Sequence, residues 1–143
     1  MNTPDSGVIL HIVLKVDDQE EKIPADIASS FFSELTSTLC QNFITVYKIG
    51  GVSDHIHIAC ALPCHMSQDE LVELIKKTSS KWLIEQGFVE GGFSWQAGYG
   101  AFSIGNSQLE MLTQYIEQQQ EYHEDVTFEA EYQQFLELYE LND

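Results

Sequence analysis

Arginine is absent from this chain of 143 residues, and only six lysines stand against 23 aspartate and glutamate residues, giving a formal net charge of −17. A protein that binds nucleic acid through many phosphates usually carries a basic surface, so this balance argues against broad nucleic-acid binding. A small local site is still compatible with it. The one cluster of positive charge consists of Lys76, Lys77 and Lys81, and no lysine follows it.

Long apolar runs are absent as well. No stretch approaches the roughly 20 apolar residues that span a bilayer, and the first six residues lack the basic region and apolar core of a secretion signal. We therefore expect a soluble cytoplasmic protein with no membrane partner. With a hydrophobic fraction of 43%, residues 1–143 are expected to fold as a single domain around one core.

The most informative segment, Asp54–Ala59, has the pattern of a buried strand and carries two histidines separated by one isoleucine. Side chains alternate between the faces of a strand, so His55 and His57 share one face while Ile56 lies on the other. Two imidazoles on one face can hold a divalent cation if a third ligand comes from elsewhere. The alternative interpretation is an ordinary half-exposed strand face.

Cysteine is scarce. Cys40, Cys60 and Cys64 are an odd and small number for a disulfide framework, so we expect reduced thiols. The spacing of Cys60, Cys64 and His65 suggests a zinc site together with the histidine pair. Strand alternation, however, places Cys60 on the face opposite that pair, which favours core and loop thiols.

The apolar pattern predicts an α+β domain. Strand patterns alternate with helix patterns, and the expected order gives an antiparallel sheet with helices packed on one face. Gly50 and Gly51 are expected to form a tight turn between the second and third strands. Ser67 and Thr127 are expected to begin helices. The expected strands span residues 8–16, 43–49, 52–62 and 91–103, and the expected helices span 24–41, 68–86, 109–122 and 127–141.

The third helix offers partners for the histidine pair. Tyr115 and Gln119 are four residues apart, so a phenol and an amide lie on one side of this helix. A helix that reaches the histidine face would bring both to the edge of a metal site. The alternative is that Tyr115, one of six tyrosines, only packs against its neighbours.

Taken together, these motifs resemble the IS200/IS605 family of single-tyrosine transposases, including those associated with repetitive extragenic palindromes (REP). The resemblance covers nearly the whole chain, in the family's order and spacing. The segment Trp95-Gln-Ala-Gly-Tyr-Gly-Ala-Phe-Ser103 is the most specific part. The other matching parts are His11-Ile-Val13, Gly50-Gly-Val-Ser-Asp-His-Ile-His-Ile58, Leu71 to Trp82, and Tyr115 to Gln119 followed by His123 and Thr127-Phe128.

The resemblance implies a ferredoxin-like, RRM-like fold and a site with named roles. His55 and His57 would be the paired histidines of the HUH motif, Gln119 the third metal ligand, and Tyr115 the nucleophile. The family uses Mg²⁺ or Mn²⁺ to polarise the scissile phosphate of single-stranded DNA. Attack by the tyrosine then gives a 5′-phosphotyrosine link and a free 3′-hydroxyl, which lets the enzyme rejoin strands without ATP.

The same resemblance implies partners. Members of the family act on DNA hairpin ends as homodimers, in which the tyrosine helix of one subunit can serve the histidine pair of the other. By this resemblance Lys76, Lys77 and Lys81 are candidates for DNA contacts, and the protein would associate with the nucleoid when bound to DNA.

The chain departs from the family in its charge. Family members usually carry lysine and arginine after the first strand and on the helices that face DNA, whereas residues 17–21 here include four acidic side chains. Tyr122 stands where the family commonly has a histidine beside His123. The leading hypothesis is a DNA strand transferase. The alternative is a domesticated relative that keeps the fold and acts as a binding or interaction module.

Overall fold

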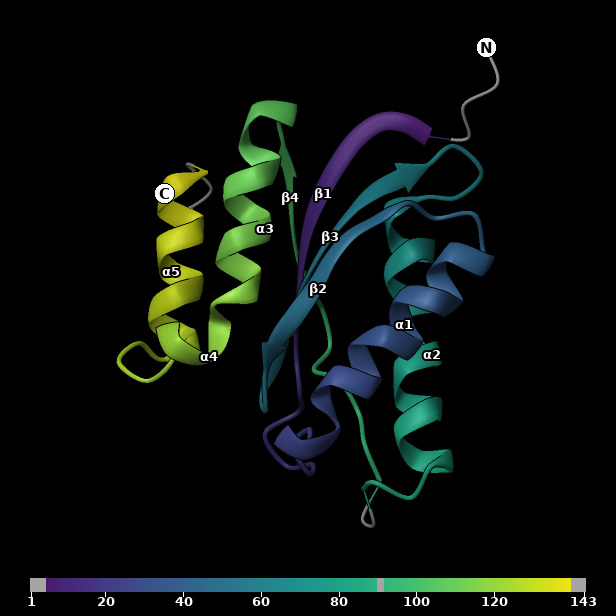
Figure 1. Ribbon diagram of the computed structural model, residues 1–143, viewed down its shortest axis with the longest axis vertical. Helices are drawn as coiled ribbons and strands as arrows, with labels where there is room; N and C mark the ends of the chain where they lie inside the picture. Colours follow the sequence, from purple (N-terminus) through teal and green to yellow (C-terminus); the bar gives the residue numbers. More distant parts are fainter. Residues whose placement is uncertain (1–4, 90–91, 140–143) are drawn as a thin grey trace.

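The computed structural model describes residues 5–89 and 92–139. Its strands form one antiparallel sheet in the order β2-β3-β1-β4, with β1 and β3 at the centre (Figure 1). The elements in chain order are β1 (Asp5–Lys15), η1 (Ala25–Ile27), α1 (Ala28–Gln41), β2 (Val46–Val52), β3 (His55–Pro63), α2 (Gln68–Glu85), β4 (Gly100–Ile104), η2 (Asn106–Gln108), α3 (Leu109–Glu117), α4 (Gln119–Tyr122) and α5 (Phe128–Leu138).

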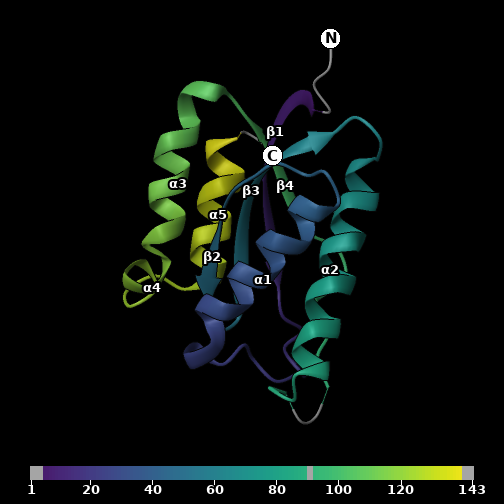
Figure 2. The same cartoon turned by 45° about the vertical axis from the view of Figure 1, so that its right-hand side comes forward.

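One face of the sheet carries the main apolar core. Ile12 and Leu14 of β1 pair with Ile58 and Ile56 of β3, and these four side chains are completely buried. They belong to the same apolar cluster as the buried residues of α1 and α2, so both helices cover this face. Figure 2 shows α1 and α2 side by side on this side of the sheet.

The opposite face is smaller and partly polar. Here β1 presents Ile9 and His11, and β3 presents Ala59 and both histidines of the His-x-His pair. Helices α3, α4 and α5 lie over this face, away from α1 and α2 (Figure 1). A second apolar cluster joins Ile9 and Ala59 to residues of β4 and α3. The histidine pair is therefore enclosed between the sheet and the last three helices.

The expected α+β class with an antiparallel sheet is confirmed. The sequence analysis placed the helices on one face, whereas α3 to α5 form a second layer on the other, because small side chains and imidazoles leave room there for helices. The expected caps are confirmed: Ser67 and Glu70 form a capping box, and the Thr127 side chain accepts a hydrogen bond from the Ala130 backbone N–H.

Two boundaries differ from the sequence analysis. The regular part of the last strand is short, because the segment that contains Gly98 at a positive φ of 82° precedes β4 as irregular backbone. Gln118 separates α3 from α4, which divides the single helix expected over residues 109–122. The expected end of the last helix at Leu141 and the start of the last strand at Gly91 lie outside the described residues.

The prediction of a turn at Gly50 and Gly51 is wrong. Both glycines lie inside β2, and the turn to β3 falls at residues 53–54. They are required for close packing instead. A Cβ atom on Gly51 would lie 2.3 Å from the His55 carbonyl oxygen, and one on Gly50 would lie 2.7 Å from a side-chain carbon of Ile116 in α3. These glycines thus let β3 and α3 approach β2.

The three cysteines are free thiols in different environments. Cys60 is buried in the main core, on the face opposite the histidine pair as expected, and burial raises the pKa of its thiol to about 12. Cys40 and Cys64 are exposed, and all three thiols are free. Within the described residues, none of the helices has both the length and the apolar character needed to cross a membrane.

Replacing Gly51 should destabilise the fold strongly. In Gly51→Ala the new methyl group meets backbone atoms of His55 and Ile56 that cannot move alone, so we expect a loss of about 2 kcal/mol or more in the free energy of unfolding. Urea unfolding measures it. Gly105→Ala is the control, because the added Cβ would lie 3.7 Å from its nearest neighbour, an oxygen of Gln108, and it should change the free energy by no more than about 0.5 kcal/mol. Equal effects would contradict the packing role of Gly51.

Candidate metal centre

The two histidines of β3 form the part of the site that lies on the sheet. His55 and His57 have no solvent-exposed surface, and each directs its Nε2 atom toward one carboxylate oxygen, Oε1 of Glu131, at 3.1 and 3.0 Å. Strand alternation puts both rings on this face, as the sequence analysis predicted. Burial excludes the alternative of a half-exposed strand face.

The Nδ1 atom of each ring is held by a neighbour. His55 Nδ1 donates to the carboxylate of Asp54 at 2.8 Å, and His57 Nδ1 lies 2.8 Å from Nε2 of His11 on β1. Burial lowers the pKa of His11 to about 3, so this ring is neutral, and its Nε2 can accept a hydrogen bond from His57 Nδ1 when His57 Nε2 carries no proton, as in a metal complex. A histidine held in this way at Nδ1 presents Nε2 to a metal.

Two further side chains come from the C-terminal part of the chain. His123, just after α4, donates from Nδ1 to the carbonyl oxygen of Val126 at 2.5 Å. Its Nε2 atom lies 3.2 Å from the same Glu131 oxygen that the strand histidines face. Glu131 belongs to the first turn of α5 and is 1% exposed. Three imidazoles therefore converge on one buried carboxylate oxygen.

Helices α3 and α4 bring the other two expected site residues to the second oxygen of Glu131. The Gln119 side-chain amide donates to Oε2 at 2.9 Å, and the Tyr115 hydroxyl donates to the same atom. Gln119 is 1% exposed, and its amide oxygen lies 3.1 Å from Nε2 of both His55 and His123. Four residues expected at the site, His55, His57, Tyr115 and Gln119, thus lie together around Glu131.

The carboxylate controls the protonation of its neighbours. Burial alone would raise the pKa of Glu131, but the hydrogen bonds from His55 and His57 outweigh burial and hold this pKa well below its usual range. Burial alone would lower the pKa of His55, but its hydrogen bonds to Asp54 and Glu131 outweigh burial and raise this pKa to about 9. For Tyr115, burial and the hydrogen bond to Glu131 both raise the pKa. The phenol is therefore protonated in this arrangement.

Tyr122 lies near the site without entering it. Its ring meets the Tyr115 ring edge-on, with centroids 5.2 Å apart. Its hydroxyl, however, donates to the side-chain oxygen of Gln134 at 2.7 Å and faces away from the carboxylate. Tyr122 is therefore a natural comparison for Tyr115: a second phenol, on the next helix, with no contact to the histidines of β3 among the described interactions.

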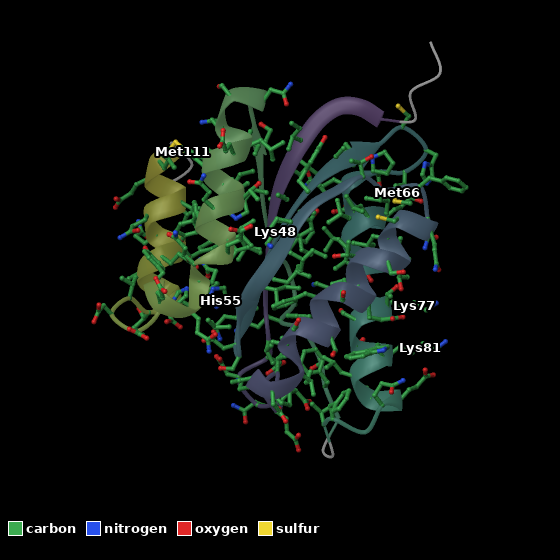
Figure 3. The ribbon with its side chains drawn as sticks, viewed as in Figure 1. Lys48, His55, Met66, Lys77, Lys81 and Met111 are labelled. Atoms are coloured by element: carbon green, nitrogen blue, oxygen red, sulfur yellow. The ribbon has the colours of Figure 1, made fainter. Side chains whose placement is uncertain are left out.

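The three candidate DNA-binding lysines lie elsewhere. Lys76, Lys77 and Lys81 belong to α2, which covers the face of the sheet opposite the histidine pair. Figure 3 shows Lys77 and Lys81 along α2, with His55 on the other side of the sheet. The Lys76 ammonium donates to the carbonyl oxygens of Gln96 and Gly98 at 3.0 and 2.9 Å, so it holds the loop before β4.

The surface beside the histidine site is acidic. A shallow groove opens next to His123 and is bordered by Asp54, Glu124 and Glu129. Lys15 reaches this side of the sheet, but it is paired with Asp18 at 2.5 Å. A groove of this charge attracts cations and repels a phosphate backbone.

The donor set fits a divalent metal ion. One ligand atom from each of His55, His57, His123 and Glu131 can be chosen so that all four lie within 4.8 Å of one another. Imidazole and carboxylate groups are the usual ligands of zinc and of several other divalent metals. Among the described residues no group of three or more His, Cys, Asp or Glu ligands includes Cys60, Cys64 or His65, so the zinc site considered from the sequence does not form.

Sequence reasoning missed three members of the site: His11, His123 and Glu131. His11 and His123 belonged to motifs already recognised, but neither had been given a role. For Glu131, one feature of the sequence could have indicated a buried position. It stands three residues after Phe128 and four before Phe135, on the apolar side of an amphipathic helix. A lone carboxylate in such a position needs a buried partner.

Comparison with known proteins gives the family. The family model for IS200-like transposases matches residues 5–119, about four fifths of the chain. This chain belongs to that family. The match includes His55, His57, Tyr115 and Gln119, whereas His123 and Glu131 lie beyond it. No match was found among curated protein sequences.

Two solved structures share the fold. One is a candidate transposase from Deinococcus radiodurans R1, with 15% sequence identity, a TM-score of 0.59, and coverage of 78% of this chain and 89% of the other. The second is a REP-associated tyrosine transposase bound to a REP hairpin, with 13% identity, a TM-score of 0.61, and coverage of 84% and 70%. At these identities the likeness shows the fold alone.

Removing the acceptor behind His57 should weaken metal binding. His11→Phe keeps an aromatic ring among Phe102 and Phe135 but leaves His57 Nδ1 without its partner. We expect the affinity for Zn²⁺, measured by calorimetry, to fall by roughly 10–100-fold. His65→Phe, at an exposed position, is the control and should leave it unchanged. Equal affinities in the two variants would show that His11 has no part in the site.

Proposed function

We propose that this IS200-like transposase cuts and rejoins single-stranded DNA through a covalent 5′-phosphotyrosine bond to Tyr115. The observation that supports this most is the convergence of four residues on one buried point: the tyrosine and Gln119 from α3 and α4, and two imidazoles from β3. Membership of the transposase family supports strand transfer as the reaction class.

In this proposal His55, His57 and Gln119 hold the divalent ion, Mg²⁺ or Mn²⁺. The two imidazoles are fixed by Asp54 and His11, so they need little rearrangement to bind. The bound ion would neutralise the scissile phosphate and stabilise the charge that develops on its oxygens. The role of the protein is to keep this phosphate next to the phenol.

The covalent step uses the oxygen of Tyr115 as the nucleophile. It forms a bond to the phosphorus atom while the bond from phosphorus to the 3′ oxygen breaks. The phenol proton passes to water, and the departing 3′ oxygen takes a proton to become a hydroxyl. The reverse reaction with another 3′-hydroxyl restores the phenol and rejoins a strand, so no external energy source is needed.

The partner in this proposal is a DNA hairpin end. A structural neighbour was solved with a REP hairpin, and the family chemistry needs an accessible single strand. We also propose a homodimer. The tyrosine described here faces the histidines of its own chain, with ring centroids of Tyr115 and His57 5.8 Å apart, so shared sites would require α3 to be exchanged between subunits.

A second candidate function is a binding or interaction module that has lost strand transfer. Two observations favour it. The groove beside His123 is acidic, and the lysines of α2 lie on the opposite face of the sheet. Both would weaken binding of a phosphate backbone.

A covalent adduct decides between the two functions. The full chain is incubated with a library of single-stranded hairpin oligonucleotides and Mn²⁺, and adducts are detected on denaturing gels. The enzyme should form an adduct that disappears completely in Tyr115→Phe, because the nucleophilic oxygen is gone. Because the acidic surface repels DNA, the yield should be low and should depend strongly on salt, which screens this repulsion.

Tyr122→Phe is the matched control for this experiment. It removes a neighbouring phenol that faces Gln134, so the adduct should persist. An adduct that survives in Tyr115→Phe and is lost in Tyr122→Phe would overturn the assignment of the nucleophile. No adduct from the unmodified protein with any hairpin would favour the module.

A further inference from the structure

Helix α5 is attached to the sheet in an unusual way. Its one fully buried residue, over the described span Phe128–Leu138, is the carboxylate Glu131. Phe128, Tyr132 and Phe135 pack beside it but are only partly buried. A helix normally docks through a stripe of buried apolar side chains, whereas here the deepest contact is polar. The position of α5 therefore depends on what holds Glu131.

We infer that a zinc-class metal ion, bound by His55, His57, His123 and Glu131, fastens α5 to the sheet in a closed site with four protein ligands. The proposed function assigns only the two strand histidines of this set, together with Gln119. The inference rests on the same histidine pair as the proposed function, but it does not require DNA cleavage.

The distances between the ligand atoms fit a tetrahedral metal ion. The Nε2 atoms of His55, His57 and His123 lie 3.1, 3.0 and 3.2 Å from Oε1 of Glu131. Bonds of about 2.0–2.1 Å to a tetrahedral zinc ion keep neighbouring ligand atoms roughly 3.3 Å apart. These three distances are close to that spacing, and all four ligand atoms lie within 4.8 Å of one another, so an ion can be placed among the four groups by side-chain movement.

The imidazole rings are also oriented for metal binding. All three imidazoles are held at Nδ1, by Asp54, His11 and the Val126 carbonyl. This common arrangement points Nε2 of each ring into the cluster, which is how metal-binding histidines are fixed by carboxylates and carbonyl groups around them. Gln119 adds a hydrogen bond to the other oxygen of Glu131, so the carboxylate is also oriented.

The ligand types select the ion. Three imidazoles and one carboxylate suit Zn²⁺, whereas Mg²⁺ prefers oxygen ligands and retains several waters. The acidic groove beside His123 gives a cation a favourable approach. Zinc is therefore the ion that the closed site should retain, and Mg²⁺ should bind it weakly.

The closed site has a consequence for strand transfer. Structural zinc sites use four protein ligands, whereas catalytic sites leave one position open. With Glu131 bound, no position remains for a phosphate oxygen, and the Tyr115 hydroxyl is engaged by the same carboxylate. DNA would have to displace Glu131, so the metal-bound closed form keeps α5 over the nucleophile.

The test uses the full chain, stripped of metal with a chelator and then titrated with zinc chloride. We expect Zn²⁺ to raise the melting temperature by roughly 10 °C at about 100 times its dissociation constant. It should also slow hydrogen exchange of the amides of residues 128–138. Magnesium chloride at the same concentration should do neither.

Glu131→Gln removes the fourth ligand with little change in shape. It should weaken zinc binding at least tenfold and abolish the added protection of α5. The matched control is Glu137→Gln, an exposed carboxylate of the same helix, which should behave like the unmodified protein. His123→Ala provides a second variant should Glu131→Gln fail to fold, and it should show the same loss.

Zinc binding of equal strength in the unmodified protein, Glu131→Gln and His123→Ala would overturn the closed site, as would zinc that binds without protecting α5. Neither result affects the adduct assay. Conversely, absence of a DNA adduct leaves the zinc-dependent protection of α5 as expected, so failure of the proposed function and failure of this inference are separate outcomes.

Discussion

The contact between one buried carboxylate and three imidazoles organises the C-terminal half of this protein. Glu131 receives hydrogen bonds at both oxygens and joins β3, α4 and α5 at a single point. A carboxylate without such partners would be costly to bury, because its charge would lose its hydration. The placement of α5, the orientation of Gln119 and the protonation of Tyr115 all depend on this contact.

The sheet makes the contact possible by separating two environments. Its α1 and α2 face is filled with aliphatic side chains and supplies the main core. Its other face combines small residues with imidazoles, and Gly50 lets α3 approach closely enough to bring Tyr115 over the site. The polar centre thus lies inside the protein without interrupting the apolar core that stabilises the fold.

Much of this arrangement could be predicted from local sequence. Strand alternation placed His55 and His57 on one face and Cys60 on the other, and helical spacing placed Tyr115 and Gln119 together. Strand alternation and helical spacing relate residues two to four positions apart, so both can be recognised from the sequence alone. The two glycines of β2 were wrongly predicted to form a turn, because a pair of glycines is typical both of a turn and of a strand that another element approaches closely. Only the tertiary contacts distinguish these two cases.

Glu131 shows why the rest of the site could not be predicted. It is one of 23 acidic residues. Its partners lie between 8 positions away in the chain, for His123, and 76 positions away, for His55. Its burial depends on the loop after α4 turning α5 back over the sheet, which no local pattern encodes. The lysines of α2 illustrate the same limit, since their cluster in sequence did not reveal which face of the sheet it would occupy.

We infer that the histidine pair of β3 belongs to a metal centre closed by α5. Anomalous X-ray diffraction from crystals of the zinc-loaded full chain tests it most directly. We expect a zinc peak among His55, His57, His123 and Glu131, with bonds of about 2.0–2.1 Å. A zinc ion bound away from this cluster, or one bound to the strand histidines with Glu131 turned out to solvent, would contradict it.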